Sequence, residues 1–300
     1  MLQQLLAFTE TAKRGSFAAA ARELGATPSA TAKAVSRLET TLGLRLFHRT
    51  TRQVTLSSDG ERLFARCQKL LSDLEEIKAE ALGAGAAPSG TLRVDLPIMF
   101  GRMFVIPLLV NLVSQHSGLK LDIRLSDAFA DIVNDGVDLA VRIGSLPDSN
   151  LIARKITSQQ WVLCASPIYL KKQGIPLTLG QLSEHDAVLF RMPTTGRNQV
   201  WYLKDGAESR VFEPQTRFKC SDGEGISEVV RLGFGIAQLP DYMVQEFLSD
   251  GSLVEVLRSY RPPSTPIYAV MPASRMIPAR VRLLLGALDT LSRDREGAGK

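Results

Sequence analysis

The segment Gly15-Ser-Phe-Ala-Ala-Ala-Ala-Arg-Glu-Leu-Gly25 sets the architecture of the N-terminal part of the chain. Ser16 can cap a short alanine-rich helix, which the closing glycine stops. Thr27 and Pro28 then supply the cap and the first position of a second helix, where proline has no N–H to leave unpaired. A helix that ends at glycine, a tight turn and a newly capped helix predict a helix-turn-helix over about residues 16–36.

The second helix and the segment after it carry hydroxyl and basic side chains on one side. Val35 and Leu38 face inward at helical spacing, and a basic hairpin with Val54 and Leu56 is predicted over about residues 49–57. The side chains expected to contact DNA are Thr27, Pro28, Ser29, Lys33, Arg37, Arg49 and Arg52. For any single arginine the alternative is a solvated surface charge. As a set they favour phosphate contacts from the hydroxyls and Arg49, a base contact from Lys33 and minor-groove entry by Arg52.

Charge is unevenly distributed along the 300-residue chain. The chain has 36 basic and 31 acidic residues, of which ten and five lie in residues 1–66, so that the remainder holds 26 of each. The net charge of +5 therefore belongs to the first fifth of the sequence. A basic N-terminal unit joined to a neutral body indicates a polyanionic partner for that unit, with double-stranded DNA as the first candidate.

A long amphipathic helix is predicted over residues 59–82. Its apolar residues recur at spacings of 4, 3, 4, 3 and 4 and are Leu63, Cys67, Leu70, Leu74, Ile77 and Ala81. This period of about 3.5 residues is typical of a coiled-coil seam, so we expect Leu63, Leu70, Leu74 and Ile77 to pair two copies of the chain. A helix packed on a core of its own chain is the alternative. The small-residue hinge at 83–90 favours a self-standing dimerising arm.

Residues 91–292 read as alternating strands and helices. Period-two apolar patterns predict strands at 91–96 and 119–125, with a helix over 104–116 between them. Further strands are expected at 137–143, 161–165, 236–239 and 267–271. The order predicts α/β layers with a largely parallel sheet. The polar residues 293–300 are expected to form a disordered tail, and neither a signal peptide nor an apolar run near membrane-spanning length is apparent.

Ligands of such α/β domains bind beyond the carboxyl ends of the strands. The candidate contacts at four such ends are Pro97, Met99, Phe100, Arg142, Gly144, Ser145, Thr194, Asp222 and Gly223. Thr194, Ser145 and free backbone N–H groups would hold a ligand carboxylate, with Arg142 balancing its charge, which favours a small organic acid. For each residue the alternative is a loop cap or a surface ion pair.

Other chemistry is weakly indicated. The three histidines are too scattered for a metal site, and no HExxH, P-loop or G-x-S-x-G motif occurs, so we expect no metal, no cofactor and no enzyme activity. The three cysteines, Cys67, Cys164 and Cys220, fit small buried residues in a reducing compartment. A redox pair of Cys164 with Cys220 is the alternative.

The chain resembles the LysR-type transcriptional regulators. The resemblance rests on the segment from Gly15 to Gly25, Ala34-Val-Ser-Arg-Leu-Glu39, Leu42-Gly-Leu-Arg-Leu-Phe47, Arg49-Thr-Thr-Arg52, Asp138-Leu-Ala-Val-Arg-Ile-Gly144 and Gly233-Phe-Gly-Ile-Ala-Gln-Leu-Pro240. It implies a multidomain α+β protein: a winged helix-turn-helix over 1–58, the dimerising linker helix, and a periplasmic-binding-protein-like effector domain over 91–292. The implied subdomains of this domain are I, about 91–161 and 266–292, and II, about 162–265.

Three functions compete at this stage. The first is a cytoplasmic regulator that binds promoter DNA and a small effector, forms dimers or tetramers and has RNA polymerase as a further candidate partner. The second is a solute-binding protein, which the first 60 residues oppose. The third is an enzyme carrying a DNA-binding module, for which no motif speaks.

Overall fold

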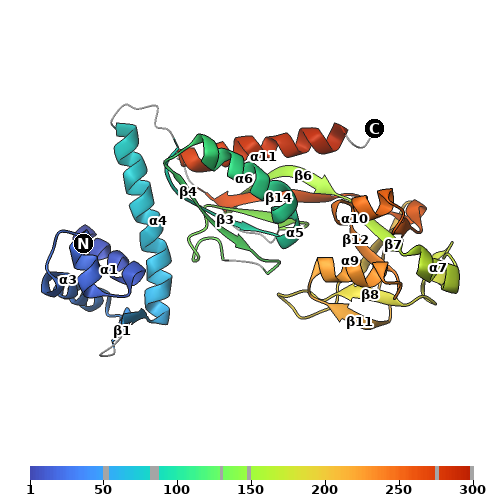
Figure 1. Cartoon of the computed structure of the whole chain (residues 1–300), viewed down its shortest axis with the longest axis horizontal. Coiled ribbons are helices and arrows are strands. Elements are labelled where there is room, and N and C mark those ends of the chain that lie inside the picture. Colours follow the sequence, from blue (N-terminus) through green and yellow to red (C-terminus); the bar gives the residue numbers. More distant parts are fainter. Residues whose placement is uncertain (50–53, 82–87, 129–130, 147–149, 274–276, 298–300) are drawn as a thin grey trace.

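The computed structural model describes residues 1–49, 54–81, 88–128, 131–146, 150–273 and 277–297. A compact N-terminal unit and a long helix lie at one end of an elongated molecule, beside a larger α/β part (Figure 1). The elements of the N-terminal end are α1 (Leu2–Arg14), α2 (Phe17–Glu23), α3 (Pro28–Leu42), β1 (Phe47–Arg49), β2 (Val54–Leu56) and α4 (Ser58–Ala81).

The helix-turn-helix follows the predicted caps. The Ser16 side chain accepts a hydrogen bond from Ala19 N at 3.4 Å at the start of α2, and Thr27 accepts one from Ala30 N at 3.2 Å at the start of α3. Gly25 takes a left-handed φ of 61° in the turn between them, where a residue with a Cβ atom would be strained. The two helices are confirmed, and α3 continues to Leu42, beyond the expected end of the helix-turn-helix at about residue 36.

The core of this unit is aromatic and joins all its elements. Val35 and Leu38 of α3 are fully buried, as predicted, and pack with Phe8 of α1. The Phe8 ring lies 5.4 Å from that of Phe47 and 6.4 Å from that of Phe64, so that the β1–β2 hairpin and α4 close over the bundle. This packing fixes the orientation of the exposed face of α3 relative to the hairpin.

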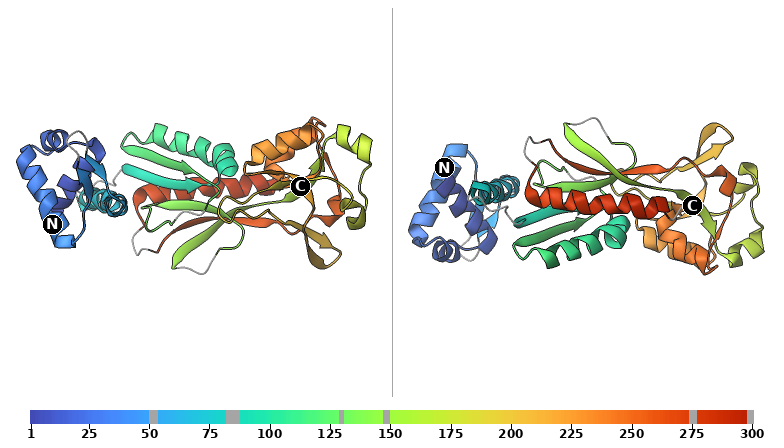
Figure 2. Two further views of the ribbon diagram at one scale, coloured as in Figure 1. Left: turned by 90° about the horizontal axis from the view of Figure 1, so that it is seen from below. Right: turned by 90° about the horizontal axis from the view of Figure 1, so that it is seen from above.

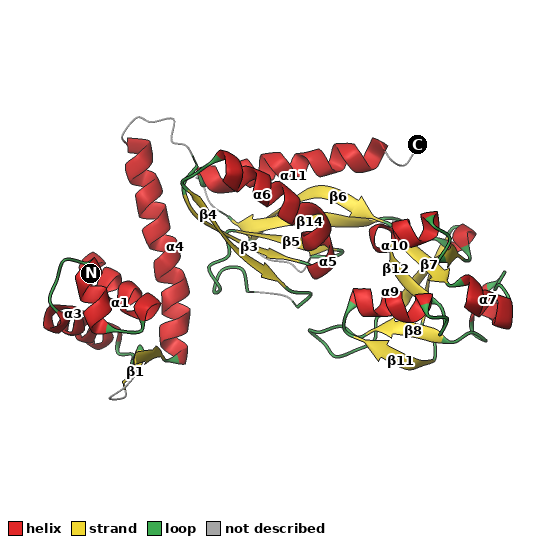
Figure 3. Ribbon diagram, viewed as in Figure 1, coloured by secondary structure: helices red, strands yellow, loops and turns green. Residues whose placement is uncertain are grey.

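Subdomain I contains a five-stranded sheet in the order β4-β3-β5-β14-β6 (Figure 3). The strands are β3 (Gly90–Leu96), β4 (Leu119–Leu125), β5 (Leu139–Ile143), β6 (Leu151–Gln159) and β14 (Thr265–Pro272). β3 pairs in parallel with β4 and β5, whereas β14 is antiparallel to both β5 and β6. Four strands of this sheet therefore run in the same direction, as expected of a largely parallel sheet, whereas β14 is reversed because it returns from subdomain II.

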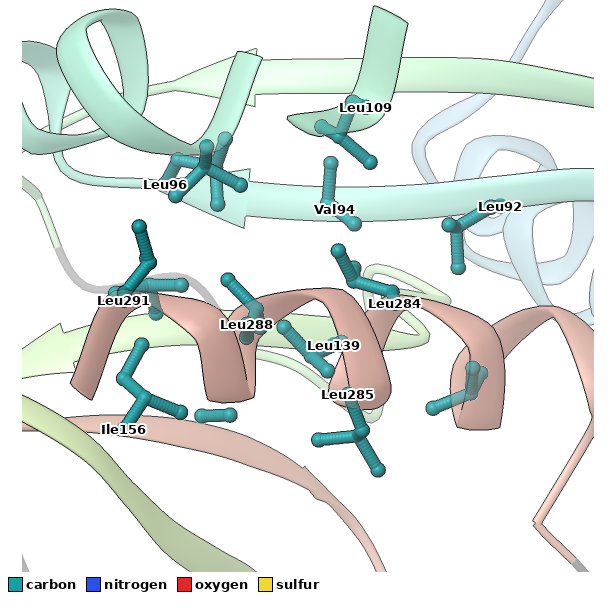
Figure 4. Close-up of a cluster of buried hydrophobic side chains, with 14 of the residues drawn as sticks. Leu92, Val94, Leu96, Leu109, Leu139, Ile156, Leu284, Leu285, Leu288 and Leu291 are labelled. Atoms are coloured by element: carbon teal, nitrogen blue, oxygen red, sulfur yellow. The ribbon is translucent and has the colours of Figure 1, made fainter. Parts of the chain in front are cut away.

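Two helical segments cover this sheet. One is continuous through α5 (Ile98–Phe100), the π-helical turn η1 (Gly101–Val105) and α6 (Ile106–Gln115), and the other is α11 (Ala279–Gly297), which lies along subdomain I in Figure 2. Figure 4 shows their leucines against those of the strands. The packed residues labelled there are Leu92, Val94, Leu96, Leu109, Leu139, Ile156, Leu284, Leu285, Leu288 and Leu291.

Two expectations about helices need correction. The helix predicted over 104–116 begins at Ile98, and the stretch Ile98–Gln115 is long and apolar enough to cross a membrane by composition alone. Its side chains Leu109 and Leu112 are buried in the core of subdomain I, so it is a core helix. At the C-terminus α11 continues to Gly297, where a disordered tail was expected from residue 293, because the helix is already nucleated on the core.

Subdomain II is built from small sheets with helices around them. Its strands are β7 (Trp161–Ala165), β8 (Ala187–Phe190), β9 (Trp201–Asp205), β10 (Glu208–Phe212), β11 (Thr216–Cys220), β12 (Ala237–Pro240) and β13 (Val254–Glu255). Its helices are α7 (Pro167–Gln173), α8 (Leu179–Leu182), α9 (Gly223–Arg231), α10 (Asp241–Ser249) and the 3-10 turn η2 (Arg258–Tyr260). β9 and β10 form a separate hairpin.

The chain crosses twice between the subdomains. β6 ends at Gln159 opposite Thr265, the first residue of β14, so the outgoing and returning strands are paired. Trp161 Nε1 donates a hydrogen bond to Thr265 Oγ1 at 3.0 Å across this junction. Tyr242 of α10 packs into the core of subdomain I against Phe100. The two subdomains are therefore held against each other at the crossing.

Candidate functional site

The first candidate site is the exposed face of α3. Thr27, Pro28, Ser29, Lys33 and Arg37 are all exposed, whereas Thr31, Val35 and Leu38 of the same helix are buried. The Thr27 hydroxyl oxygen caps α3 by accepting from Ala30 N. The hydroxyl can still donate its own hydrogen toward a ligand on the outside. The arrangement presents a helix start and two long cations from one surface.

These cations are not neutralised by the protein. Among the described residues, neither Lys33 nor Arg37 has an acidic partner within 4.0 Å, whereas Arg14 of α1 pairs with Glu23 at 2.6 Å. Arg22 and Arg45 are two further exposed cations of the same unit without such a partner among the described residues. A cluster of unpaired exposed cations attracts a polyanion and releases its counterions on binding.

The hairpin is anchored to α3 by side-chain hydrogen bonds. Glu39 Oε1 accepts from Leu46 N at 2.9 Å, and Ser57 Oγ accepts from Gly60 N at 3.0 Å, which joins the hairpin to the start of α4. Arg52 and the side chain of Arg49 lie outside the described residues, so their proposed DNA contacts remain predictions.

The seam of α4 differs from the expectation at its N-terminal end. Leu63 and Cys67 pack into the core of the chain's own N-terminal unit, because α4 closes over Phe8. Leu63 is therefore engaged within the subunit. Leu70, by contrast, is 46% exposed and Leu74 is half-buried, and the side chain of Ile77 lies outside the described residues. Any partner helix must be met by the part of α4 from Leu70 onward.

The second candidate site is a cleft of about 1110 Å³ between the two subdomains. Six of the nine predicted ligand contacts line it, namely Pro97, Met99, Arg142, Gly144, Ser145 and Gly223. They come from the carboxyl ends of β3 and β5 and from the first residue of α9, as the strand-end rule predicts. The three others are not part of its described lining.

Each of the three exceptions has a structural reason. Phe100 is fully buried and stacks on Phe104 and Tyr242 in the core of subdomain I. Asp222 caps α9, where its Oδ2 accepts from Gly225 N at 2.7 Å. Thr194 is followed by Thr195, which lines the cleft in its place. A one-residue offset at a turn cannot be read from a sequence pattern.

Arg142 belongs to a buried charge cluster as well as to the cleft wall. It is 6% exposed, and its Nη1 donates to Asp95 Oδ1 at 2.6 Å and to Val141 O at 3.0 Å. Asp95 is fully buried and also pairs with Arg124. Arg142 is thus committed to an internal carboxylate, which reduces the charge that it offers to a ligand.

Asp127 brings a negative charge to the cleft that the sequence did not single out. Its Oδ1 accepts from Ile98 N at 3.0 Å, which occupies the first backbone donor of α5. Burial raises the pKa of Asp127, and the charge of Asp222 acts in the same direction. The ionised carboxylate is therefore disfavoured where it stands.

Asp127→Asn should raise the melting temperature at pH 7 by roughly 1–2 °C. A carboxyl whose pKa is raised by folding loses stability as the pH rises through that pKa, so the gain should vanish below about pH 4, where folded and unfolded carboxyls are both protonated. Asp131, whose pKa is lowered by hydrogen bonds from Asn134, is the matched control, and Asp131→Asn should act in the opposite direction. Thermal melts from pH 3 to 8 test both; a pH-independent difference for Asp127→Asn would contradict this assignment.

The lining also includes five aromatic residues, which come from subdomain II and the crossing strands. Trp161, Phe190, Tyr202, Tyr242 and Tyr268 face the cleft. No local motif marks them, since aromatic residues in strands are ordinarily core residues. Their gathering at one cleft could be seen only after folding.

The β9–β10 hairpin forms one wall, and the Gln238 side chain bonds to its backbone. Gln238 Oε1 accepts from Tyr202 N at 3.0 Å, and its Nε2 donates to Tyr202 O at 2.7 Å. Gln238 is 5% exposed and also lines the cleft. Gln238 therefore links the cleft to the hairpin.

Metal and thiol chemistry find little support. Within the described parts of the chain, no three His, Cys, Asp or Glu side chains are grouped so as to hold a metal ion. Cys67 and Cys164 are buried, as expected, and all three cysteines are free. Burial raises the pKa of Cys164 to about 12, which opposes thiolate chemistry and hence the redox pairing with Cys220.

Comparison with known proteins bears on both sites. Residues 2–61 match the family described as bacterial regulatory helix-turn-helix protein, lysR family, and residues 85–292 match the LysR substrate binding domain. The chain is 34% identical over 283 residues to the HTH-type transcriptional regulator DmlR of Escherichia coli, covering 94% of this chain and 92% of that protein. It is 33% identical over 291 residues to an HTH-type transcriptional regulator of Xanthomonas campestris, covering 96% and 85%. These relatives are transcriptional regulators rather than enzymes.

Solved structures agree along the whole chain. CrgA, a LysR-type transcriptional regulator from Neisseria meningitidis, superposes with a TM-score of 0.62 at 29% identity, covering 96% of this chain and 97% of that one. The full-length Vibrio cholerae virulence activator AphB gives a TM-score of 0.60 at 28% identity, covering 96% and 98%.

Proposed function

Because the chain belongs to the LysR family of transcriptional regulators, we propose that it controls promoters by binding DNA through α3 and the hairpin, and that a small molecule in the cleft modulates this binding. The observation that carries the DNA-binding half is that Lys33 and Arg37 are exposed on a capped helix and have no acidic partner within the part of the chain that the structure describes. Lys33 is assigned to base edges in the major groove, and Arg37 to phosphate.

Self-association belongs to the same proposal. A two-fold protein binds two half-sites of a pseudo-palindromic promoter, and α4 offers Leu70 and Leu74 for pairing with a second copy. A dimer of dimers and contact with RNA polymerase are further partners that we propose for a regulator acting in the cytoplasm.

The ligand that we propose is a small organic acid with an apolar or aromatic body. The aromatic residues of the lining suit such a body, while Asp127 repels a carboxylate from its own part of the cleft wall. Arg210 is paired with Asp205 at 3.3 Å, whereas Arg197 has no acidic partner within 4.0 Å among the described residues. We therefore assign the ligand carboxylate to Arg197 and Ser145, and a second ligand oxygen to Arg142 on the cleft wall.

Lys33→Ala should weaken binding to a duplex taken from upstream of the coding region by about 1–3 kcal/mol and relax its sequence preference. The loss follows from removing a base contact, which counts most on the correct sequence. Fluorescence anisotropy against this duplex and a scrambled one, over a salt series, measures both effects. Wild-type affinity should fall steeply with salt.

Lys13→Ala is the matched control, because Lys13 is an exposed lysine of α1 paired with Glu10 at 2.9 Å. It should leave affinity and preference nearly unchanged. Equal losses on specific and scrambled duplexes from Lys33→Ala would overturn the base contact. Failure of the wild-type protein to bind any upstream duplex at low salt would overturn the DNA-binding function itself.

A further inference from the structure

A chain of charged contacts begins at the cleft wall. Arg142 lines the cleft, and its Nη1 donates to Asp95 Oδ1 at 2.6 Å. Arg124 Nε donates to Oδ2 of the same carboxylate. Asp95 is fully buried, whereas the Arg124 side chain is 46% exposed, so the carboxylate joins an inner guanidinium to an outer one.

The chain of contacts continues to α4. Arg124 Nη1 donates to Asp135 Oδ2 at 3.0 Å, in the loop 131–136 that connects β4 to β5. In this loop Asn134 N donates to Asp131 Oδ1 at 3.0 Å, and Asn134 Oδ1 accepts from Arg66 of α4. The loop is therefore bonded on one side to the cluster at the cleft and on the other to the helix that carries the DNA-binding unit.

Backbone packing makes the contact with α4 a close one. Gly136 has a φ of +65°, and a Cβ there would lie 3.0 Å from Ala65 O. Beside it Arg93 Nη2 donates to Gln68 Oε1 at 2.8 Å. A displacement of loop 131–136 would therefore displace the backbone of α4, because the two are closely packed.

Large hinge motion of the subdomains is opposed by their own contacts. Tyr242 of α10 lies 5.5 Å from Phe104 in the core of subdomain I, and Arg102 pairs with Glu224 of α9 at 2.8 Å. A ligand therefore acts first on the side chains of the cleft wall.

We infer that Arg142, Asp95, Arg124 and Asp135 couple occupancy of the cleft to the placement of α4, with Arg124 as the central positioning residue. The inference rests on ligand binding in the cleft, as proposed above. A ligand oxygen that engages Arg142 weakens its hold on Asp95, and the charge of Asp95 is then shared with Arg124 alone. Arg124 is drawn toward Asp95 and away from Asp135, which releases loop 131–136 and its contact with Arg66.

Hydrogen exchange of the full-length protein, measured by mass spectrometry without DNA or ligand, tests the coupling. Arg124→Met should speed amide exchange in residues 62–70 and 131–136 by about three- to fivefold, because it removes the ion pair with Asp135 that holds the loop in place. Arg102→Met is the matched control: its side chain is 48% exposed and forms one ion pair, outside this chain of contacts. It should leave exchange in 62–70 as in the wild type.

The role of Arg142, at the cleft end of these charged contacts, is tested by combining substitutions. Arg142→Met should speed exchange in 62–70, and in the Arg124→Met background it should add nothing, because both act through Asp95. If Arg142→Met does not fold, Arg142→Lys takes its place with a smaller effect in the same direction. Unchanged exchange in Arg124→Met, an equal rise in Arg102→Met, or multiplied effects in the double variant would each overturn the inference. Since neither DNA nor ligand is present, such a failure is distinct from a failure to bind DNA.

Discussion

Leu70→Glu should convert the protein to a monomer and lower its affinity for the upstream duplex by about 10²–10⁴-fold. The Leu70 side chain is 46% exposed in the single chain, on the part of α4 that the N-terminal unit leaves uncovered. Because only the exposed part of Leu70 would be newly buried against a second copy, the gain is about 1 kcal/mol per side chain, and a carboxylate in its place would be desolvated in the seam. Loss of the second half-site accounts for the fall in DNA affinity.

Light scattering and anisotropy at one fixed salt concentration measure the two effects. Leu177→Glu is the control, since Leu177 is 72% exposed in subdomain II and should tolerate the charge without change of mass or affinity. A Leu70→Glu variant that remains a dimer would show that α4 does not pair at this position.

Asp138→Ala should destabilise the effector domain by about 3–5 kcal/mol, which lowers its melting temperature by roughly 10 °C. Arg280 is fully buried, and its Nη2 donates to Asp138 Oδ1 at 3.2 Å. Asp138 Oδ2 also accepts from Arg93 N at 3.0 Å, so the carboxylate links α11 to the middle of β3. Removing it leaves a buried guanidinium charge without this counter-ion.

Asp122→Ala removes a carboxylate that is 65% exposed and lies 3.4 Å from Arg93, and it should change stability by less than about 0.5 kcal/mol. Calorimetry of both variants makes the comparison. Similar melting temperatures for Asp138→Ala and the wild type would show that the buried pair of Asp138 and Arg280 does not stabilise the domain.

The DNA-binding unit was largely predictable because its signals are local. Ser16, Thr27 and Pro28 act within a few residues of their own position, and the structure has the caps where the sequence placed them. The family resemblance extended this to the whole chain, and it is confirmed by the matched families.

Errors arose where a residue's surroundings come from distant segments. Leu63 has seam spacing, yet it is covered by α1, which lies some 50 residues away in sequence. The direction of β14 depends on where the chain returns from subdomain II, and a strand's own apolar pattern is the same in either direction. Asp127 reaches the cleft from a loop without a recognisable motif, and Gln238, although it lies in the Gly233–Pro240 segment of the family resemblance, carries no signal of its own for the cleft.

The crossing of the chain at Gln159 and Thr265 has a consequence for biosynthesis. The sheet of subdomain I lacks its fourth-placed strand, β14, and the covering helix α11 until the residues from Thr265 to Gly297 have left the ribosome. The N-terminal unit is complete some 200 residues earlier and can fold on its own schedule. A nascent chain, or a chain truncated before Thr265, would have a complete DNA-binding unit attached to an effector domain with an open, aggregation-prone sheet edge. Such a chain would compete for promoters unless cellular quality control removed it.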